Sequence, residues 1–159
     1  MSERDLFIAG LVAYAAEGTK KKPWQTSRPV GFTNSDPRMI RLFLRWLSLM
    51  GIDRSSLSFR VFIHRGADVA SALRFRSGVV GLPPERFHRT TLKNGNPKTR
   101  RRNTGPDYRG CLVVGVYRSG DLNKQLAGWF DAMTGNLVEQ NLIRANDPST
   151  GRHSSALRY

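Results

Sequence analysis

The chain has 159 residues, and its 26 lysines and arginines against 12 aspartates and glutamates give a formal net charge of +14. This length suits one domain with its own core, and the basic excess indicates an anionic partner such as nucleic acid. The single cysteine, Cys111, excludes an internal disulfide and disfavours a zinc site. No hydrophobic run is long enough for a membrane span or a signal peptide, so we expect no membrane contact and a cytoplasmic, nucleoid-associated protein.

The first predicted element is a helix over residues 6–18, LFIAGLVAYAAEG, which carries no charge before Glu17. Ser2 or Asp5 can cap its start, and Gly18 suits the left-handed conformation that ends many helices. Because the helix is apolar all round, we expect it to be buried on every side, with small side chains that allow another backbone to approach. An acid in the last turn is unfavourable against the helix dipole, so Glu17 is a candidate ligand for Mg²⁺.

A basic segment, TKKKPWQTSRP, follows the first helix and precedes a short predicted strand over residues 30–34. Together they can form a two-stranded ribbon that carries cationic and aromatic side chains toward a phosphate backbone. A solvated loop is the alternative. The candidate DNA-binding residues of this segment are Lys20, Lys21, Lys22, Trp24 and Arg28.

Asn34-Ser35-Asp36-Pro37 predicts the start of a second helix, which should run to about Met50 and end at Gly51. Residues 57–64 then alternate as a strand does, with Leu57, Phe59, Val61 and Ile63 on a core face. The other face carries Arg60, Phe62 and His64, which suit the reading of base edges in a major groove, although a solvent-facing sheet is the alternative. A third helix is predicted over residues 67–79, capped by Asp68.

Residues 87–93 are predicted to form a strand, and the most basic part of the chain, KNGNPKTRRRNTGPDYRG, follows as a long hairpin loop. Contact with DNA, a nuclear-localisation signal and RNA binding are all open interpretations of this loop. Residues 111–118 predict the strongest strand, and residues 121–134 predict a last amphipathic helix that Gly135 ends. We expect residues 136–159 to be a polar, partly disordered tail. The candidate DNA-binding residues of the loop are Lys93, Lys98, Arg100, Arg101 and Arg102.

Residues 6–18 resemble the motif of the LAGLIDADG homing endonuclease family, with Glu17-Gly18 matching the acidic residue and the final glycine. Counted back from Gly18, the family's first glycine falls on Val12 and its leucine on Ala13, so the motif is degenerate. The order of predicted elements over residues 3–134 and the run VGFTNSDPRMIRLFLRWL resemble the family as well. The resemblance implies an α/β (α+β) domain over residues 1–135, with a curved antiparallel sheet and helices packed on one face.

In that family two such helices pack together, and each supplies one metal-binding carboxylate. The resemblance therefore implies a homodimer on near-palindromic double-stranded DNA, with Mg²⁺ at Glu17 and Gly18. The implied dimer interface consists of Ala9, Val12, Ala13 and Ala16. The implied catalytic residues are Glu17, Asn34, which would position water, Arg38, and Arg118 near the scissile phosphate, with Lys93 as the alternative to Arg118.

The function that these observations favour is a sequence-specific, Mg²⁺-dependent DNA endonuclease. A transcription regulator that kept the fold and lost cleavage is the first alternative, and the departures at Val12 and Ala13 favour it. Glu17 favours the enzyme, because an acid near phosphates weakens binding unless it holds a metal. An RNA-binding, maturase-like protein is the third hypothesis. A His-Asn-His nuclease is disfavoured because His64, His88 and His153 lack the required spacing.

Overall fold

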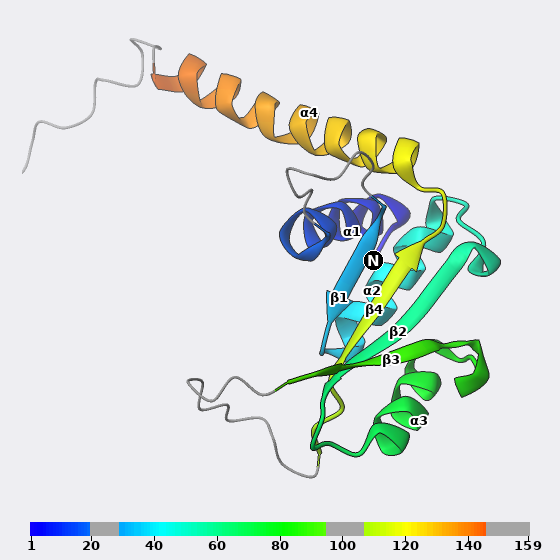
Figure 1. The fold of residues 1–159 in the computed structure, drawn as a ribbon. Coiled ribbons are helices and arrows are strands. Elements are labelled where there is room, and N and C mark those ends of the chain that lie inside the picture. The colour runs from blue at the N-terminus through cyan, green and yellow to red at the C-terminus, as the bar shows by residue number, and fades with distance from the viewer. Residues whose placement is uncertain (20–28, 95–106, 146–159) are drawn as a thin grey trace, which may run out of the picture.

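The computed structural model describes residues 1–19, 29–94 and 107–145, with side chains up to residue 135. Four helices and a four-stranded sheet make up this part of the chain, which is a mixed α and β domain (Figure 1). Short 3₁₀ turns, Arg54–Ser56 and Pro84–Arg86, precede β2 and β3. The elements in chain order are α1 (Glu3–Glu17), β1 (Gly31–Asn34), α2 (Pro37–Leu49), β2 (Leu57–His64), α3 (Val69–Val80), β3 (His88–Lys93), β4 (Cys111–Val116) and α4 (Gly120–Ala145).

The sheet has the strand order β1-β4-β2-β3. β4 pairs antiparallel with β1 and β2, whereas β2 and β3 run parallel. The predicted all-antiparallel sheet is therefore wrong at β3. The reason is the connection: α3 carries the chain back along the sheet before β3 begins, and a helical crossover of this kind delivers the next strand in the parallel direction.

One face of the sheet forms the core, as the alternation in residues 57–64 predicts. The side chains of Leu57, Phe59, Val61 and Ile63 are buried, and the residues between them are more exposed. Buried side chains from all four helices join this core, so the helices cover one face of the sheet. The opposite face, which we call the open face, is defined on β2 by the side chains that alternate with the core, namely Ser58, Arg60, Phe62 and His64.

α1 begins with a capping box, because Ser2 Oγ accepts from Asp5 N at 3.1 Å and Asp5 Oδ2 accepts from Ser2 N at 2.9 Å. The expectation that α1 is buried on every side is wrong for the single chain. Ile8 and Val12 are 41% and 45% exposed, one turn apart on the same side of the helix. α1 is instead buried on one side only.

The buried side of α1 approaches α2 at Gly10. A Cβ atom on Gly10 would lie 2.0 Å from Trp46 Cγ, so the absence of a side chain is what lets the indole ring reach the α1 backbone. Gly10 therefore allows a close contact between α1 and α2 of the same chain. Gly18 likewise departs from expectation, since its φ of −67° is extended rather than left-handed. A Cβ there would lie 2.4 Å from Tyr14 O, which explains the glycine in steric terms.

α4 continues through Gly135 to Ala145, so the expected end of the helix at Gly135 is wrong. An interior glycine costs a helix only about 1 kcal/mol relative to alanine, and the helix-forming residues around it outweigh that cost. α4 lies across α1, and its C-terminal end extends beyond it (Figure 1). Residues 146–159, the rest of the expected tail, lie outside the described residues. Within the described ranges, none of the helices has the length and apolar character needed to cross a bilayer.

The contact between Gly10 and Trp46 predicts a large effect of a small change. Gly10→Ala should lower the free energy of unfolding by about 1–3 kcal/mol, because the added methyl group overlaps the indole ring. Gly78→Ala is the matched control, since a Cβ on this helical glycine meets nothing within 4 Å. That control should be neutral or stabilising. Chemical denaturation measures both, and equal effects would contradict the packing described for α1.

Candidate nucleic-acid interface

Three of the predicted DNA-binding residues, Arg60, Phe62 and His64, lie together on the open face of β2. Lys93, at the end of β3, joins them because it pairs with His64 in the parallel register. Its Nζ atom lies 5.2 Å from the centroid of the Phe62 ring, a cation–π geometry. The structure thus brings these four residues onto one surface.

Three aromatic residues that the sequence analysis did not select extend the open face. The ring of Tyr108 stacks on His64 with centroids 5.7 Å apart. His88 Nε2 and Tyr117 Oη lie 2.7 Å apart, within hydrogen-bond distance. Tyr117 continues the two-residue period of β4 past its end, which is the signal that could have identified it. Rings and cations on an open sheet can stack on bases and bind phosphates.

The carboxylate of Glu17 lies at the end of α1, and Glu17 is exposed. Gly18, directly after it, bridges Phe32 of β1, and Thr19 N donates to Gly31 O at 2.8 Å. The end of α1 therefore lies beside β1. Asn34 follows two residues after Phe32, which is about 7 Å along an extended strand. Glu17, Gly18 and Asn34 are brought to the same part of the molecule.

A single acidic residue organises the turn between β1 and α2. Asn34 Oδ1 accepts from Asp36 N at 2.8 Å, and Asp36 Oδ1 accepts from Arg38 N at 2.8 Å to cap the helix. The Arg38 guanidinium also donates to the Asp36 carboxylate, with Nε 3.1 Å from both oxygens and Nη2 2.6 Å from Oδ2. Asp36 thus joins both of the expected catalytic residues in this turn, although the sequence suggested only a cap.

Arg76 is a buried cation beneath this turn. Only 1% of its surface is exposed, and burial lowers the pKa of its guanidinium. Nη2 donates to Ser35 O at 2.9 Å and to Gly110 O, and Nε donates to Arg109 O at 3.2 Å. Arg76 therefore ties α3 to the start of α2 and to the start of β4. Its sequence signal is an arginine in the apolar stripe of α3, between Ala72 and Val80.

Arg118 lies apart from Asn34. It sits in the turn after β4 with a φ of 49°, a left-handed conformation that is strained for a side chain other than glycine. Ser119 Oγ accepts from Val30 N at 2.7 Å, which fixes this turn at the start of β1. Asn34, at the other end of β1, pairs with Leu112. The four expected catalytic residues are therefore not gathered in one chain, because Arg118 is at the opposite end of the β1–β4 pair.

Of the expected dimer residues, Val12 and Ala16 are on the outward side of α1, whereas Ala13 packs against the core. Val12 and Ala16 are exposed, and Ala9 and Ala13 are partly exposed. Of the described residues, no three His, Cys, Asp or Glu side chains cluster as a metal site. The remaining DNA-binding predictions fall outside the described ranges, namely Lys20, Lys21, Lys22, Trp24, Arg28, Lys98, Arg100, Arg101 and Arg102.

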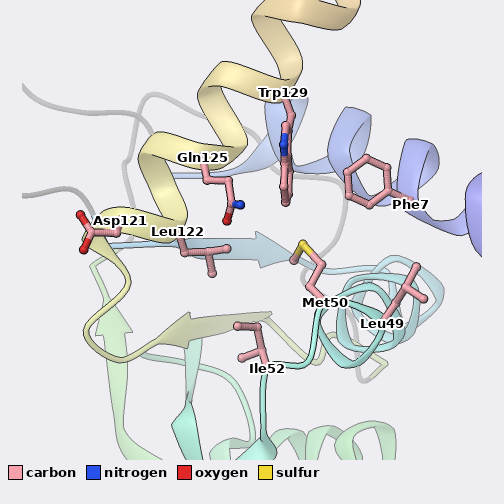
Figure 2. A pocket seen from close by; sticks show the side chains of 8 residues that line it. All are labelled: Phe7, Leu49, Met50, Ile52, Asp121, Leu122, Gln125 and Trp129. Atoms are coloured by element: carbon pink, nitrogen blue, oxygen red, sulfur yellow. The ribbon is translucent and has the colours of Figure 1, made fainter.

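A groove lies among the helices, away from the sheet's open face. It has a volume of about 750 Å³ and lies between α1, the end of α2 and α4. Phe7 and Trp129 are neighbours in the groove (Figure 2), and their rings meet edge to face with centroids 5.2 Å apart. Asp121 and Gln125 are its polar lining residues, and the rest of the lining is apolar. None of the residues predicted for the nucleic-acid site lines it.

Comparison of the chain with models of known protein families, with curated proteins and with solved structures finds no match.

The Asp36–Arg38 pair gives a direct test of the turn. The guanidinium, by hydrogen bonding to the carboxylate, lowers the pKa of Asp36 from 3.8 to about 2. A lowered pKa stabilises the folded chain above pH about 4, and that contribution is lost as the pH falls from there through about 2. Arg38→Gln should raise the pKa of Asp36 toward 3.8, measured by carboxyl ¹³C NMR. Arg41→Gln, an exposed substitution on the same helix, is the control, and a pKa that stays near 2 in Arg38→Gln would contradict the pairing.

Proposed function

We propose that the protein is a sequence-specific double-stranded DNA endonuclease that acts as a homodimer with Mg²⁺. One observation carries the proposal: an exposed carboxylate, Glu17, ends a helix whose outward side is apolar, beside a sheet whose open face is basic and aromatic. The resemblance of residues 6–18 to the LAGLIDADG motif supports the same assignment.

The outward side of α1 supports a second copy of the chain as its partner. Ile8 and Val12 expose their apolar side chains, and exposed Ala16 follows at the same spacing of four residues. Exposed apolar residues in a row on one helix face are typical of an interface. A two-fold axis along this stripe would bring two copies of Glu17 near each other, since a two-fold contact uses the same patch on both chains.

The open face supports duplex DNA as the substrate. Arg60 and Lys93 supply positive charge, and His64 and His88 supply ring nitrogens that can bond base edges. A strand pair presented on its open side fits a major groove, which admits a two-stranded β-ribbon. The net charge of +14 supports strong, salt-dependent binding to the phosphate backbone.

The donor chemistry at the end of α1 fits Mg²⁺. This ion prefers oxygen ligands and is commonly held by one or two carboxylates together with substrate phosphates and waters. Glu17 would supply the carboxylate, and the backbone of Gly18 lies next to it. When bound, the ion would neutralise charge on the phosphate that is cut. Arg38 would bind that phosphate, and the Asn34 amide would orient a water near it.

A DNA-binding protein that does not cut is the second candidate. The distance between Arg118 and Asn34 along the β1–β4 pair favours it, because one expected phosphate-binding cation is separated from the rest. Such a regulator would use the same open face and the same dimer. The two candidates differ only in whether Glu17 supports hydrolysis.

Cleavage of a randomised duplex library in Mg²⁺ tests the enzyme assignment. Glu17→Gln should reduce the rate at least about 100-fold while duplex binding remains, because a metal-binding carboxylate supplies several kcal/mol to the transition state. Glu3→Gln, an exposed acid at the other end of α1, should cut at nearly the wild-type rate. Specific binding without cleavage by the wild type would favour the regulator, and preference for structured RNA over duplex would contradict both.

Val12→Lys tests the dimer. The side chain is 45% exposed, so the fold should tolerate the change, whereas two facing lysines should raise the dimer dissociation constant at least about tenfold. Sedimentation velocity measures the dissociation constant, and circular dichroism checks the fold. Ala70→Lys adds the same charge at an exposed position of α3 and should leave the dimer dissociation constant unchanged. A monomeric wild type, or equal effects of both variants, would contradict an interface through α1.

A further inference from the structure

We propose that Asp36 is a positioning residue: its carboxylate holds the Arg38 guanidinium until a DNA phosphate replaces that carboxylate as the partner of Arg38. The inference rests on the proposed function, and it assigns a role to a residue that the sequence marks only as a helix cap. The geometry of the turn between β1 and α2 carries it.

The edge of Arg38 that would bind phosphate is occupied in the free chain. Nε and Nη2 both donate to the Asp36 carboxylate, at 3.1 Å and 2.6 Å. This is the same planar fork of donors with which arginine binds phosphate in a bidentate manner. Arg38 therefore cannot present that edge to Asp36 and to a phosphate at once.

The pair is placed where a phosphate can reach it. The Arg38 side chain is 85% exposed and that of Asp36 is 32% exposed, so exchange of the carboxylate for a phosphate needs no opening of the core. An exposed ion pair of this kind is weak enough to be exchanged, and it still orders the arginine. In the free chain the guanidinium would thus be held close to Asn34, at the end of β1, instead of moving freely in the solvent.

Other hydrogen bonds hold the turn between β1 and α2 when the Arg38 side chain moves to a phosphate. Asp36 Oδ1 still accepts from the backbone N of Arg38, and Asp36 N still donates to Asn34 Oδ1. Arg76, fixed beneath the turn through Ser35 O, adds a second positive charge that favours the ionised carboxylate of Asp36. The helix cap and the position of Asn34 therefore survive the exchange, and only the Arg38 side chain moves.

Asp36→Asn separates this role from the cap, because asparagine caps a helix as well as aspartate does but holds a guanidinium poorly. The control is Asp53→Asn, which removes the same charge from an exposed capping aspartate whose Oδ1 accepts from Ser55 N at 2.7 Å. Among the described residues, no arginine or lysine forms an ion pair with Asp53. Asp36→Asn should bind a duplex about two- to fivefold more tightly than Asp53→Asn does. The excess should vanish in an Arg38→Gln background.

The Arg38 Nε NMR signal gives a readout that a purely structural role would not change. In the free protein it should differ between the wild type and Asp36→Asn, and with saturating duplex the two signals should converge because a phosphate replaces Asp36 in both. Equal effects of the Asp36 and Asp53 substitutions, or signals that stay apart on DNA, would overturn this inference and leave DNA binding intact. A wild type that binds no duplex would overturn the proposed function and this inference with it.

Discussion

The orientation of α1 on the core depends on the contact between the α1 backbone and the ring of Trp46. Gly10 lets the indole ring reach the α1 backbone, and this contact orients the Gly10 side of α1 toward α2. That orientation directs Leu6, Leu11 and Tyr14 into the core and leaves Ile8 and Val12 outside. It also sets where Glu17 emerges at the end of the helix. The proposed dimer and the proposed metal site both depend on this one packing constraint.

The sheet forms the surface that is proposed to bind DNA. β2 divides its side chains between the core and the open face, and it lies between β4 and β3, so it fixes the open face of the whole sheet. Partners from β3 and from the segments around β4 then complete a surface of rings and cations. The end of α1 lies beside β1, the strand at one edge of the sheet and next to β4.

Local features were predictable from the sequence because their causes are local. The alternation of residues 57–64 predicted the two faces of β2, and the capping residues Asp36 and Asp68 predicted two helix starts. For α1 the sequence left Ser2 and Asp5 open, and the cap is Ser2. The direction of β3 was predicted wrongly, because it depends on how α3 packs rather than on the strand's own residues. The continuation of α4 past Gly135 was missed because an interior glycine weakens a helix by only about 1 kcal/mol and need not end it.

In the candidate site, too, features with a local cause were predictable from the sequence and features that depend on tertiary packing were not. The grouping of Arg60, Phe62 and His64 follows from the two-residue period of a strand, whereas the addition of Lys93 and Tyr108 depends on pairing across the sheet. The hydrogen bonds of Arg76 join residues 33 to 41 positions apart in the chain, so no local pattern could have revealed them. The separation of Arg118 from Asn34 likewise appears only with the register of β1 on β4.

The proposed dimer brings two α1 helices together along their outward sides. Electron–electron double resonance on a single spin label tests it directly, with Arg4→Cys labelled in a Cys111→Ser background and the protein saturated with duplex. Packed helices lie about 8–10 Å apart, and α1 is only about 22 Å long, so paired helices should give a label-to-label distance below roughly 35 Å. The absence of any dipolar coupling between chains on DNA would contradict the account.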